Sequence, residues 1–577
     1  MTLALKSWMA NEGPKHFIMM VWVGVNVFLF WRTFMLYYSG AQYYYLHKML
    51  GLGLCISRAS ASVLNLNCSL VLLPMCRSVL TLLRASQRVT SRQVRRLLDK
   101  SKMFHMTCGI TICVFSVIHV SAHLMNMVNF SVRYSEDFPE LNVAQYKGQD
   151  PRILILSTVP GVTGVLLVIV LCLMFTASSY SIRFSSYEIF WYTHNLFIVF
   201  YLILMLHVVG GALKYQLNVE SHPPGCVHTN LSSHSLTNHR AAGEKDSRSV
   251  CLEEACFQTH FPQTWLWVSA PLCLYCAERL YRYIRSTAEP VTIINVVSHP
   301  CDVLEVRMLK SGFKPRPGQY ILLNCPSVSS FENHPFTLTV CPTGKNATFG
   351  IHLRVLGDWT SRFSQLLLKQ SNSSEILPMM QQRRYPTVHV DGPFGSPSEE
   401  VFNYEVSLCV AGGIGVTPFA CVLQALFEDW RQYKLKRLYF VWVCRDLQSF
   451  YWFADLLCGL HERLWHNNRP DYLNVQLYLS DSQGLQDIGE ERYRFLSSRL
   501  RIGRPKWKLL FQEIGRANQH KRVGVFCCGP KGISKALHTL LFYSFSFYSL
   551  FIGYLYYFCF YSLHISSITI FTFHANL

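Results

Sequence analysis

The sequence predicts a chain in two parts, a bundle of six membrane-spanning helices followed by a cytosolic module of one β-barrel domain and one α/β domain. Three observations predict this multi-domain fold. Long apolar runs fill the first half of the 577-residue chain, alternating strand-like residues begin after Glu289, and a glycine-rich turn joins a buried strand to a helix at residues 411–418. The formal net charge is +19, and much of it lies beside the apolar runs, so membrane topology explains it better than nucleic-acid binding.

The six spans set the topology of the chain. We expect them at about residues 17–37, 49–76, 103–127, 154–177, 187–211 and 264–284. The loop between the second and third spans is strongly basic. Its basic residues are Arg84, Arg88, Arg92, Arg95, Arg96, Lys100 and Lys102, and its one acid is Asp99. A short basic loop stays cytoplasmic, so the N-terminus and everything after Tyr283 are expected inside.

Histidines inside two of the spans are the strongest sign of function, because imidazoles are costly in hydrocarbon. The third span carries His105, His119 and His123, and the fifth carries His194 and His207. His105 and His119 are separated by about 21 Å along a helix and by some 40° around it. Two stacked haems would explain the pattern, the inner one held by His105 and His194 and the outer one by His119 and His207. The alternative is that the histidines are polar residues facing neighbouring helices.

The fifth span fits this arrangement only with a distortion. On an ideal helix, the spacing turns His207 about 140° away from His194. We therefore expect a kink, a π-bulge or a rotamer correction between the two residues.

Arg58 places a charge in or near the outer half of the second span. Such a charge needs a partner, for which we expect a haem propionate or a reduced-oxygen species. The alternative is an arginine whose head reaches the outer headgroups.

The loops expected outside carry features of an oxidising compartment. Asn129 and Asn230 begin N-glycosylation sequons, and Cys226, Cys251 and Cys256 lie in the loop at residues 212–263. Two of the three cysteines could pair, but the sequence does not select the pair.

Two stretches of the cytosolic half are candidates for a flavin site, and the alternative is that they are ordinary strand ends. HPFTLTVCP begins at His334 and GIHLRVLGDWTSRF begins at Gly350. Thr337 could bond the flavin ring or ribityl chain, and Arg354 could neutralise a pyrophosphate.

The last third of the chain predicts a nicotinamide-nucleotide site. Gly412, Gly413 and Gly415 would let backbone amides approach a phosphate at a helix N-terminus. Arg445 follows the next strand, and its position suits a ribose 2′-phosphate, hence NADPH over NADH. Residues 528–530 (Cys-Gly-Pro) follow a later strand, again at the end where open α/β sheets bind ligands.

Together these motifs resemble the NADPH oxidase catalytic subunits of the phagocyte type, the heavy chains of a flavocytochrome b. The resemblance covers about residues 5–540. The matching segments are FH at 104–105, IHVSAHLMN at 118–126, FWYTHNLF at 190–197, HPFTLT at 334–339, GDWT at 357–360, DGPFG at 391–395, AGGIGVTPFA at 411–420 and CGPK at 528–531.

The resemblance implies a ferric-reductase-like di-haem domain at residues 1–286, a ferredoxin-reductase-like FAD-binding barrel at 287–396 and an NADPH-binding domain at 397–540. It also implies the cofactor-binding residues. These are His334, Pro335, Phe336, Thr337, Leu338, Thr339, Val340, Arg354, Trp359, Thr360, Gly412, Gly413, Gly415, Thr417, Pro418, Cys444, Arg445, Cys528, Gly529 and Pro530. Arg58 and His123 are implied to line the oxygen-reducing pocket above the outer haem.

The implied activity is electron transfer from cytosolic NADPH through FAD and two b-type haems to oxygen outside, which yields superoxide. The implied location is the plasma membrane. Family members of this type pair with a small membrane subunit and with cytosolic organiser and activator proteins and a Rac-type GTPase. A metalloreductase is the alternative enzyme.

Three departures from the family pattern affect these expectations. The segment from Asp481 to Gly503 is shorter than the family's NADPH-domain insert and differs from it, which affects the coupling to activators expected there. Asn195 replaces a histidine next to His194. The atypical apolar tail at 541–577 replaces the usual ending near the flavin, so a catalytically impaired haem-binding variant is a further alternative.

Overall fold

The computed structural model describes residues 12–574 except for 86–91, 143–149, 211–212, 227–249, 343–346, 373–384, 482–490, 520 and 543–568. The described chain forms two compact units. One contains Ile18–Met75 and Lys102–Tyr275, and the other contains Met1–Phe17, Cys76–Ser101 and Cys276–Leu577. The basic loop therefore groups with the domains that follow the bundle rather than with the helices that flank it.

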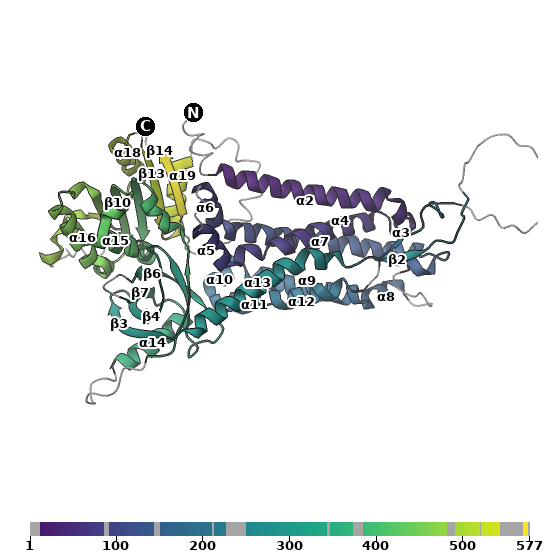
Figure 1. Ribbon diagram of the computed structural model, residues 1–577, viewed down its shortest axis with the longest axis horizontal. Coiled ribbons are helices and arrows are strands. Elements are labelled where there is room, and N and C mark those ends of the chain that lie inside the picture. The colour runs from purple at the N-terminus through teal and green to yellow at the C-terminus, as the bar shows by residue number, and fades with distance from the viewer. Residues whose placement is uncertain are drawn as a thin grey trace, which may run out of the picture. The chain divides into compact units, whose positions relative to one another are not determined.

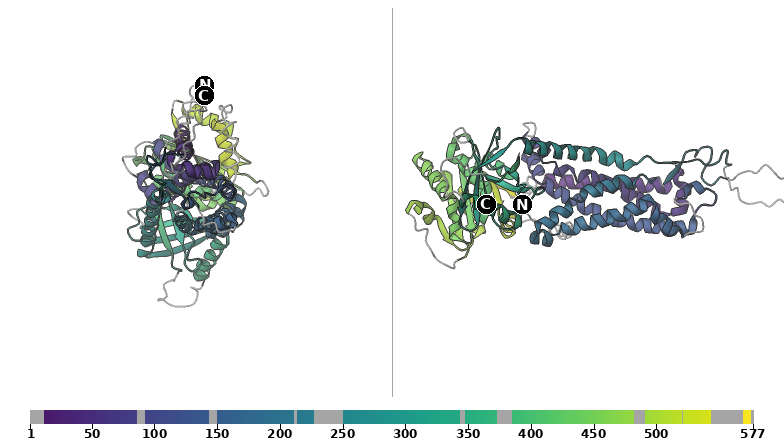
Figure 2. Two further views of the ribbon diagram at one scale, coloured as in Figure 1. Left: turned by 90° about the vertical axis from the view of Figure 1, so that its right-hand side faces the viewer. Right: turned by 90° about the horizontal axis from the view of Figure 1, so that it is seen from below.

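The membrane unit is a bundle of long apolar helices, which run alongside one another in both views (Figures 1 and 2). Five helical segments of the described chain are long and apolar enough to cross a membrane: Gly13–Ser39, Leu52–Met75, Ser101–Arg133, Val159–Ala177 and Tyr187–His207. The helices of the bundle are α2 (Gly13–Ser39), α3 (Tyr44–Leu50), α4 (Leu52–Leu70), α7 (Ser101–Arg133), α8 (Pro151–Ser157), α9 (Val159–Ala177), α10 (Tyr180–Ser185), α11 (Tyr187–His194) and α12 (Phe197–His207).

The sixth expected span is the N-terminal part of a 26-residue helix, α13 (Gln263–Ala288). It falls outside the five strongly apolar segments because its second half carries Glu278, Arg279 and Arg282. Its indole at Trp265 donates to the carbonyl of Met205 at 3.1 Å, which joins α13 to α12 inside the bundle.

The fifth span is interrupted, as its histidine spacing predicts. Helix α11 ends at His194 and α12 begins at Phe197, with Asn195 and Leu196 in a turn between them. The amide of Asn195 caps the break by donating to the carbonyl of Trp191 at 2.8 Å. Of the expected kink, π-bulge or rotamer correction, the structure shows a distortion of the backbone, an interruption of the helix at Asn195 and Leu196.

The first domain after the bundle is an antiparallel barrel with strand order β3-β4-β7-β6-β5-β8. A bridge between Val291 and Val388 connects its two edges. Its elements are β3 (Val291–His299), β4 (Val303–Lys310), β5 (Tyr320–Asn324), β6 (His334–Val340), β7 (Phe349–Arg354), α14 (Asp358–Asn372) and β8 (His389–Phe394).

The second domain after the bundle is a sheet with order β12-β11-β10-β9-β13-β14, parallel except for the last strand. Helices α15 and α16 pack on one face and α18 and α19 on the other, which explains why β9 is apolar on both sides. The elements are β9 (Val406–Gly412), α15 (Thr417–Asp429), β10 (Arg437–Cys444), η7 (Leu447–Phe453), α16 (Ala454–His466), β11 (Leu473–Leu479), α17 (Arg494–Arg499), β12 (Leu500–Ile502), α18 (Trp507–Ala517), β13 (Arg522–Cys528), α19 (Lys531–Phe542) and β14 (Thr569–His574).

The atypical tail adds a strand to this sheet. Strand β14 pairs antiparallel with β13, from Arg522↔His574 to Cys527↔Thr569. The rest of the tail lies outside the described residues, so the tail is seen here only as an edge strand.

Candidate functional site

Four histidines of the bundle share one construction: in each, Nδ1 contacts a carbonyl or hydroxyl oxygen. The partners are the carbonyl of Val71 for His105 (2.8 Å), the carbonyl of Ser57 for His119 (3.0 Å), the hydroxyl of Ser178 for His194 (3.2 Å) and the hydroxyl of Thr163 for His207 (2.9 Å). A hydrogen bond at Nδ1 fixes the ring and leaves Nε2 for a metal ion. This construction is compatible with the expected role of the four imidazoles as metal ligands.

The inner pair has the spacing that a shared metal ion requires. The ring centroids of His105 and His194 lie 6.2 Å apart. A metal ion midway between the rings would form a bond of about 2 Å to one nitrogen of each ring. These two bonds, together with the distance from each nitrogen to the centre of its ring, add up to this separation. The residues present fit one haem iron between them.

The outer end contains more than a pair of imidazoles. His123 lies one turn beyond His119 on α7, with ring centroids 4.5 Å apart. Arg58 lies close enough for its charge to act on His119, His123 and His207. The structure thus brings together both residues expected at the oxygen pocket and both expected outer haem ligands.

Aromatic side chains hold Arg58 in place. Its Nε donates to the hydroxyl of Tyr37 at 3.3 Å, and the Tyr37 ring stacks on Tyr43 at 4.1 Å. The hydroxyl of Tyr43 contacts Nε2 of His260 at 2.7 Å. Within the described part of the chain, no acidic side chain forms an ion pair with Arg58, so its charge remains available to an anion.

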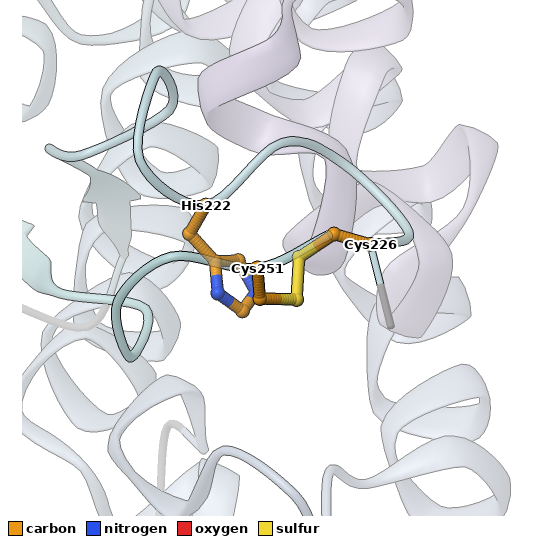
Figure 3. A group of neighbouring side chains, drawn as sticks. All are labelled: His222, Cys226 and Cys251. Atoms are coloured by element: carbon orange, nitrogen blue, oxygen red, sulfur yellow. A yellow bond between two sulfur atoms is a disulfide. The ribbon is translucent and has the colours of Figure 1, made fainter. Parts of the chain in front are cut away.

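The outer loop contains one disulfide. Cys226 pairs with Cys251, next to His222 (Figure 3), and Cys256 is left as a free, exposed thiol. Because both sulfurs are used in the disulfide, the His222 group is not a metal site. Strands β1 (Lys214–Gln216) and β2 (Phe257–Thr259) pair at the base of this loop.

The two expected sequons differ in what the structure says of them. Asn129 lies within α7, and its amide donates to the carbonyl of Leu50 at 2.6 Å. Glycosylation at Asn129 would have to release this hydrogen bond, and the site stays a prediction. Asn230 lies outside the described residues.

The expected flavin residues lie along β6 and at the start of α14. His334 stacks on Trp359 with ring centroids 4.2 Å apart, and its Nε2 contacts Oε2 of Glu332 at 3.0 Å. The hydroxyl of Thr337 bonds that of Thr417 at 2.8 Å, which joins β6 of the barrel to the first residue of α15. The barrel strand and the nucleotide helix therefore meet at the pair of threonines.

Other expected flavin residues have their side chains engaged in the fold. Leu338, Thr339 and Val340 are buried inside the barrel, so only their backbone can serve a cofactor. The hydroxyl of Thr360 accepts the backbone N–H groups of Leu356 and Gly357 at 3.0 Å and so closes the turn before α14. On the accessible side of the same region, Pro335 and Arg354 are exposed and Phe336 is half-buried.

The structure brings the glycine turn and the Cys-Gly-Pro segment into contact. A Cβ on Gly412 would come within 2.6 Å of Pro530, and one on Gly415 within 2.3 Å of the Cys528 carbonyl. Gly413, between them, has φ +55°, which side chains rarely adopt. The glycines thus serve close packing of two strand ends as well as access to a phosphate.

Three strand ends meet at this edge of the sheet. Strand β9 lies between β10 and β13, in the registers Gly412↔Val443 and Ala411↔Cys528. This arrangement is a topological switch point, where open α/β sheets bind nucleotides. Pro418, near the start of α15, is buried behind the turn.

The side chains at these strand ends differ in charge and exposure. Arg445 is exposed directly after β10, as a phosphate-binding residue must be. Burial raises the pKa of the Cys444 thiol, and burial raises the pKa of Cys528 to about 12. Both cysteines are therefore neutral thiols at pH 7.

Sequence reasoning missed the role of the DGPFG aspartate. Asp391 is bound by Arg282, through Nε at 2.8 Å and Nη2 at 2.6 Å, and by Arg285 at 2.9 Å. Both arginines lie in the C-terminal part of α13. From the sequence, their charge had indicated only on which side of the membrane this end of the span lies. Their spacing of three residues, on one helix face, was the available signal.

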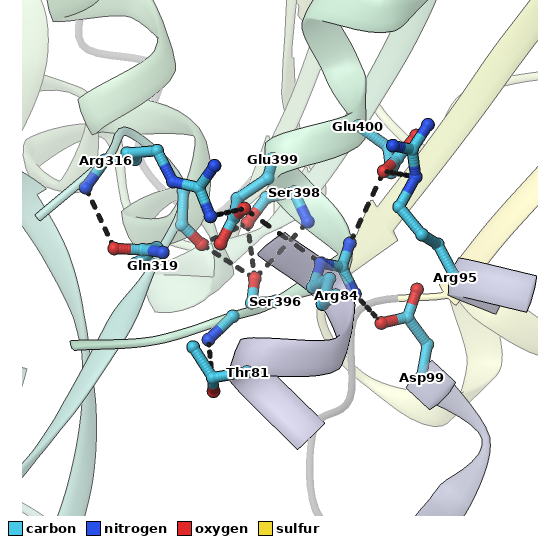
Figure 4. Close-up of polar contacts among 12 residues, drawn as sticks. Thr81, Arg84, Arg95, Asp99, Arg316, Gln319, Ser396, Ser398, Glu399 and Glu400 are labelled. Atoms are coloured by element: carbon cyan, nitrogen blue, oxygen red, sulfur yellow. Dashed lines mark hydrogen bonds and ion pairs between the residues drawn. The ribbon is translucent and has the colours of Figure 1, made fainter. Parts of the chain in front are cut away.

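A second missed contact joins the basic loop to the barrel (Figure 4). Helix α5 (Arg77–Ala85) carries Arg84, whose guanidinium contacts Asp99 and lies 3.8 Å from Glu400. Arg95, on α6 (Arg92–Asp99), pairs with Glu400 at 2.8 Å. The loop thus contacts Glu400, which directly follows the barrel strands in the chain.

Three family models match the chain in succession. They are the ferric reductase like transmembrane component at residues 58–205, the FAD-binding domain at 288–398 and the ferric reductase NAD binding domain at 404–541. Among solved structures, a ferredoxin NADP+ reductase from Neisseria gonorrhoeae with bound FAD and NADP is 14% identical, at a TM-score of 0.32 over 44% of this chain and 89% of that one.

Two curated relatives cover nearly the whole chain. NADPH oxidase 4 of Mus musculus is 62% identical over 560 residues, 94% of this chain and 97% of that protein. NADPH oxidase 1 of Mus musculus is 36% identical over 567 residues, 93% of this chain and 92% of that protein. The expected phagocyte-type subgroup is too narrow a description of this likeness, whereas the family itself is confirmed. The chain belongs to the NADPH oxidase family.

Proposed function

We propose that this protein is a transmembrane NADPH oxidase that passes electrons from cytosolic NADPH to oxygen on the far side of the membrane and produces superoxide. The observation that carries this proposal is the set of four intramembrane histidines with Nδ1 engaged, of which one pair lies 6.2 Å apart. His105 and His194 would hold the inner haem, and His119 and His207 the outer one. When bound, FAD accepts a hydride from NADPH, and the haems transfer single electrons.

The cytosolic residues bind and orient the two nucleotides in this proposal. His334 and Trp359 form an aromatic wall, and Thr337 positions the flavin beside the start of α15. Gly413 and its neighbours admit the pyrophosphate of NADPH at the helix N-terminus. Arg445 binds the ribose 2′-phosphate, because it is exposed at the end of β10 and can form a charge-assisted bond.

The outer residues act on oxygen and its reduction product. Arg58 is held by Tyr37 without a carboxylate partner in the described chain, so it attracts superoxide as the negative charge forms. His123, next to His119, completes the pocket.

The proposed location is the plasma membrane, with the N-terminus and both nucleotide domains in the cytosol. The pairing of Arg84 and Arg95 with acids of the cytosolic module supports placing the basic loop on that side. The proposed partners are a small membrane subunit, cytosolic organiser and activator proteins and a Rac-type GTPase, as in the family that the sequence resembles. Co-purification with each of these classes tests the partner set separately from catalysis.

The decisive experiment is NADPH-driven haem reduction without oxygen, in membranes supplied with FAD, followed by admission of oxygen. We expect a reduced low-spin b-type spectrum and then rapid reoxidation with superoxide release. Electron transfer to metal ions that superoxide dismutase does not inhibit would identify a metalloreductase instead. If dithionite reduces the haem but NADPH does not, electron transfer is blocked between nicotinamide and flavin. If a family-type ending in place of the atypical tail then restores reduction by NADPH, the tail is the cause of the block.

A separate experiment tests the 2′-phosphate assignment. Arg445→Ala should raise KM for NADPH by a factor of about 10–150, the equivalent of a lost charged hydrogen bond, and leave KM for NADH nearly unchanged. Equal changes for both cofactors would exclude Arg445 from the 2′-phosphate site.

A further inference from the structure

We propose that His299, Glu305 and His352 form a Zn²⁺-binding site on the barrel, separate from the residues assigned to flavin and nicotinamide. The three residues belong to adjacent strands in the order β3-β4-β7. Glu305 on β4 lies directly opposite His352 on β7 and opposite Val297 on β3. His299 lies two residues after Val297 on β3. Cross-strand positions of this kind present side chains on one face.

The ligand atoms have the separation of a tetrahedral metal site. Oε2 of Glu305 lies 3.2 Å from Nε2 of His299 and 3.7 Å from Nε2 of His352. All three ligand atoms lie within 4.8 Å of one another. Zinc bonds of about 2.0–2.1 Å in a tetrahedron place ligand atoms roughly 3.3 Å apart, so little movement is needed to bind the ion.

The buried nitrogen of His352 points to a ligand. The residue is 5% exposed, and its Nε2 has no hydrogen-bond partner in the described part of the chain. Its Nδ1 contacts the hydroxyl of Thr339 at 2.9 Å. When Nδ1 donates to Thr339, the Nε2 lone pair faces the Glu305 carboxylate, and two such groups repel unless a cation lies between them. The hydrogen bond between Nδ1 of His352 and Thr339 is the outer-sphere support that metal-ligating histidines receive.

The charge of Glu305 suits a cation. Its carboxylate contacts Nε2 of His299 and Nε of Arg307 and supplies the negative charge that a divalent cation requires. The Arg307 guanidinium contacts Oε1, which leaves Oε2 facing the two rings. The Arg307 side chain is 31% exposed, so water screens its repulsion of a bound ion.

The ligand types select zinc over the common hard cations. Two imidazoles and one carboxylate form a known zinc ligand set that leaves a fourth position for water, whereas Mg²⁺ and Ca²⁺ prefer oxygen ligands.

The ion would also support a contact between the barrel and the second domain. The ring of His352 lies 4.6 Å from that of Phe453, and the indole of Trp452 donates to the carbonyl of Pro300 at 2.9 Å, both across to η7 of the second domain.

The test uses the full chain with haem and FAD, stripped with a chelator and then titrated with Zn²⁺. The parent should retain one more zinc per chain after desalting than H299Q or H352Q, and X-ray absorption at the zinc edge should show imidazole ligands that each variant loses. H389Q, on β8 of the same barrel, is the matched control and should retain zinc like the parent. T339V should weaken zinc binding about 10–100-fold, as loss of an outer-sphere partner does.

Equal zinc content in the parent and H299Q, or an absorption spectrum without imidazole, would overturn the proposal and leave a hydrogen-bonded network only. If H352Q loses FAD because it fails to fold, H299Q alone decides. His299 ends its strand and its side chain is 19% exposed, so glutamine fits there and can still bond Glu305 while ligating zinc poorly.

Discussion

The inner and outer histidine pairs of the bundle are built alike but lie in different surroundings. In both pairs, backbone carbonyls or hydroxyls hold Nδ1 and leave Nε2 for a metal ion. Beside the outer pair lie a second histidine, His123, and the charge of Arg58. The positive charges that act on the inner pair are Lys102, on His105, and Arg183, on His194. The comparison teaches that the shared construction suits electron relay at both ends, while the additional groups suit oxygen chemistry at one end.

Removing one pair at a time should have the largest effect. H119L or H207L should abolish oxygen reduction and remove the outer haem, yet NADPH should still reduce the inner haem under anaerobic conditions. H105L should instead block reduction of the outer haem by NADPH while dithionite still reduces it. Haem content and anaerobic spectra measure this, with bound FAD as the control for folding. Oxygen reduction at the parent rate in H119L would break the assignment of the outer pair.

Arg58 should have the next largest effect. R58A should lower the rate of superoxide formation about 10–150-fold, because a charged hydrogen bond to the anion contributes about 1.5–3 kcal/mol. Both haems should still be bound and reducible, and R58K should recover part of the rate. Superoxide release and haem reduction are measured in the same membranes. A loss of haem in R58A would show that Arg58 instead holds the cofactor.

His123 should contribute less than Arg58. H123L should lower oxygen reduction only about 2–10-fold, the range for a neutral hydrogen bond, because His119 remains to ligate the haem. Stopped-flow reoxidation of the reduced haems measures the effect. An H123L protein with no outer haem would show that the two neighbouring histidines have been assigned in the wrong order.

The smallest effects should come from the hydroxyls behind the ligands, and they sharpen the comparison directly. S178A removes the partner of His194, and T163V removes the partner of His207. Each should shift the potential of its own haem by tens of mV, since about 59 mV corresponds to a tenfold change in relative affinity for one electron. Redox titration resolves the two haems. Shifts of equal size in both haems for either variant would contradict the pairing.

The sequence was most informative where polar residues lie in an apolar background. The break between His194 and His207 followed from the helical repeat, because 13 residues cannot place both rings on one face of a straight helix. The sequence was less informative at α13, where Glu278 and Arg282 lower the hydropathy of an expected span. The bond between the Asn129 amide and the carbonyl of Leu50 is visible only in the fold.

By itself, the sequence determined the elements and the residue types: the apolar helices, the spacing of the histidines, the strand-ending glycines and the basic loop. These are local properties, set by side-chain hydrophobicity and by the helix and strand repeats. Only the tertiary structure decided which groups meet. The binding of Asp391 by Arg282, the contact of Gly415 with Cys528, and the gathering of His299, Glu305 and His352 all join residues distant in the chain. Such contacts depend on strand order and register, which no local pattern encodes.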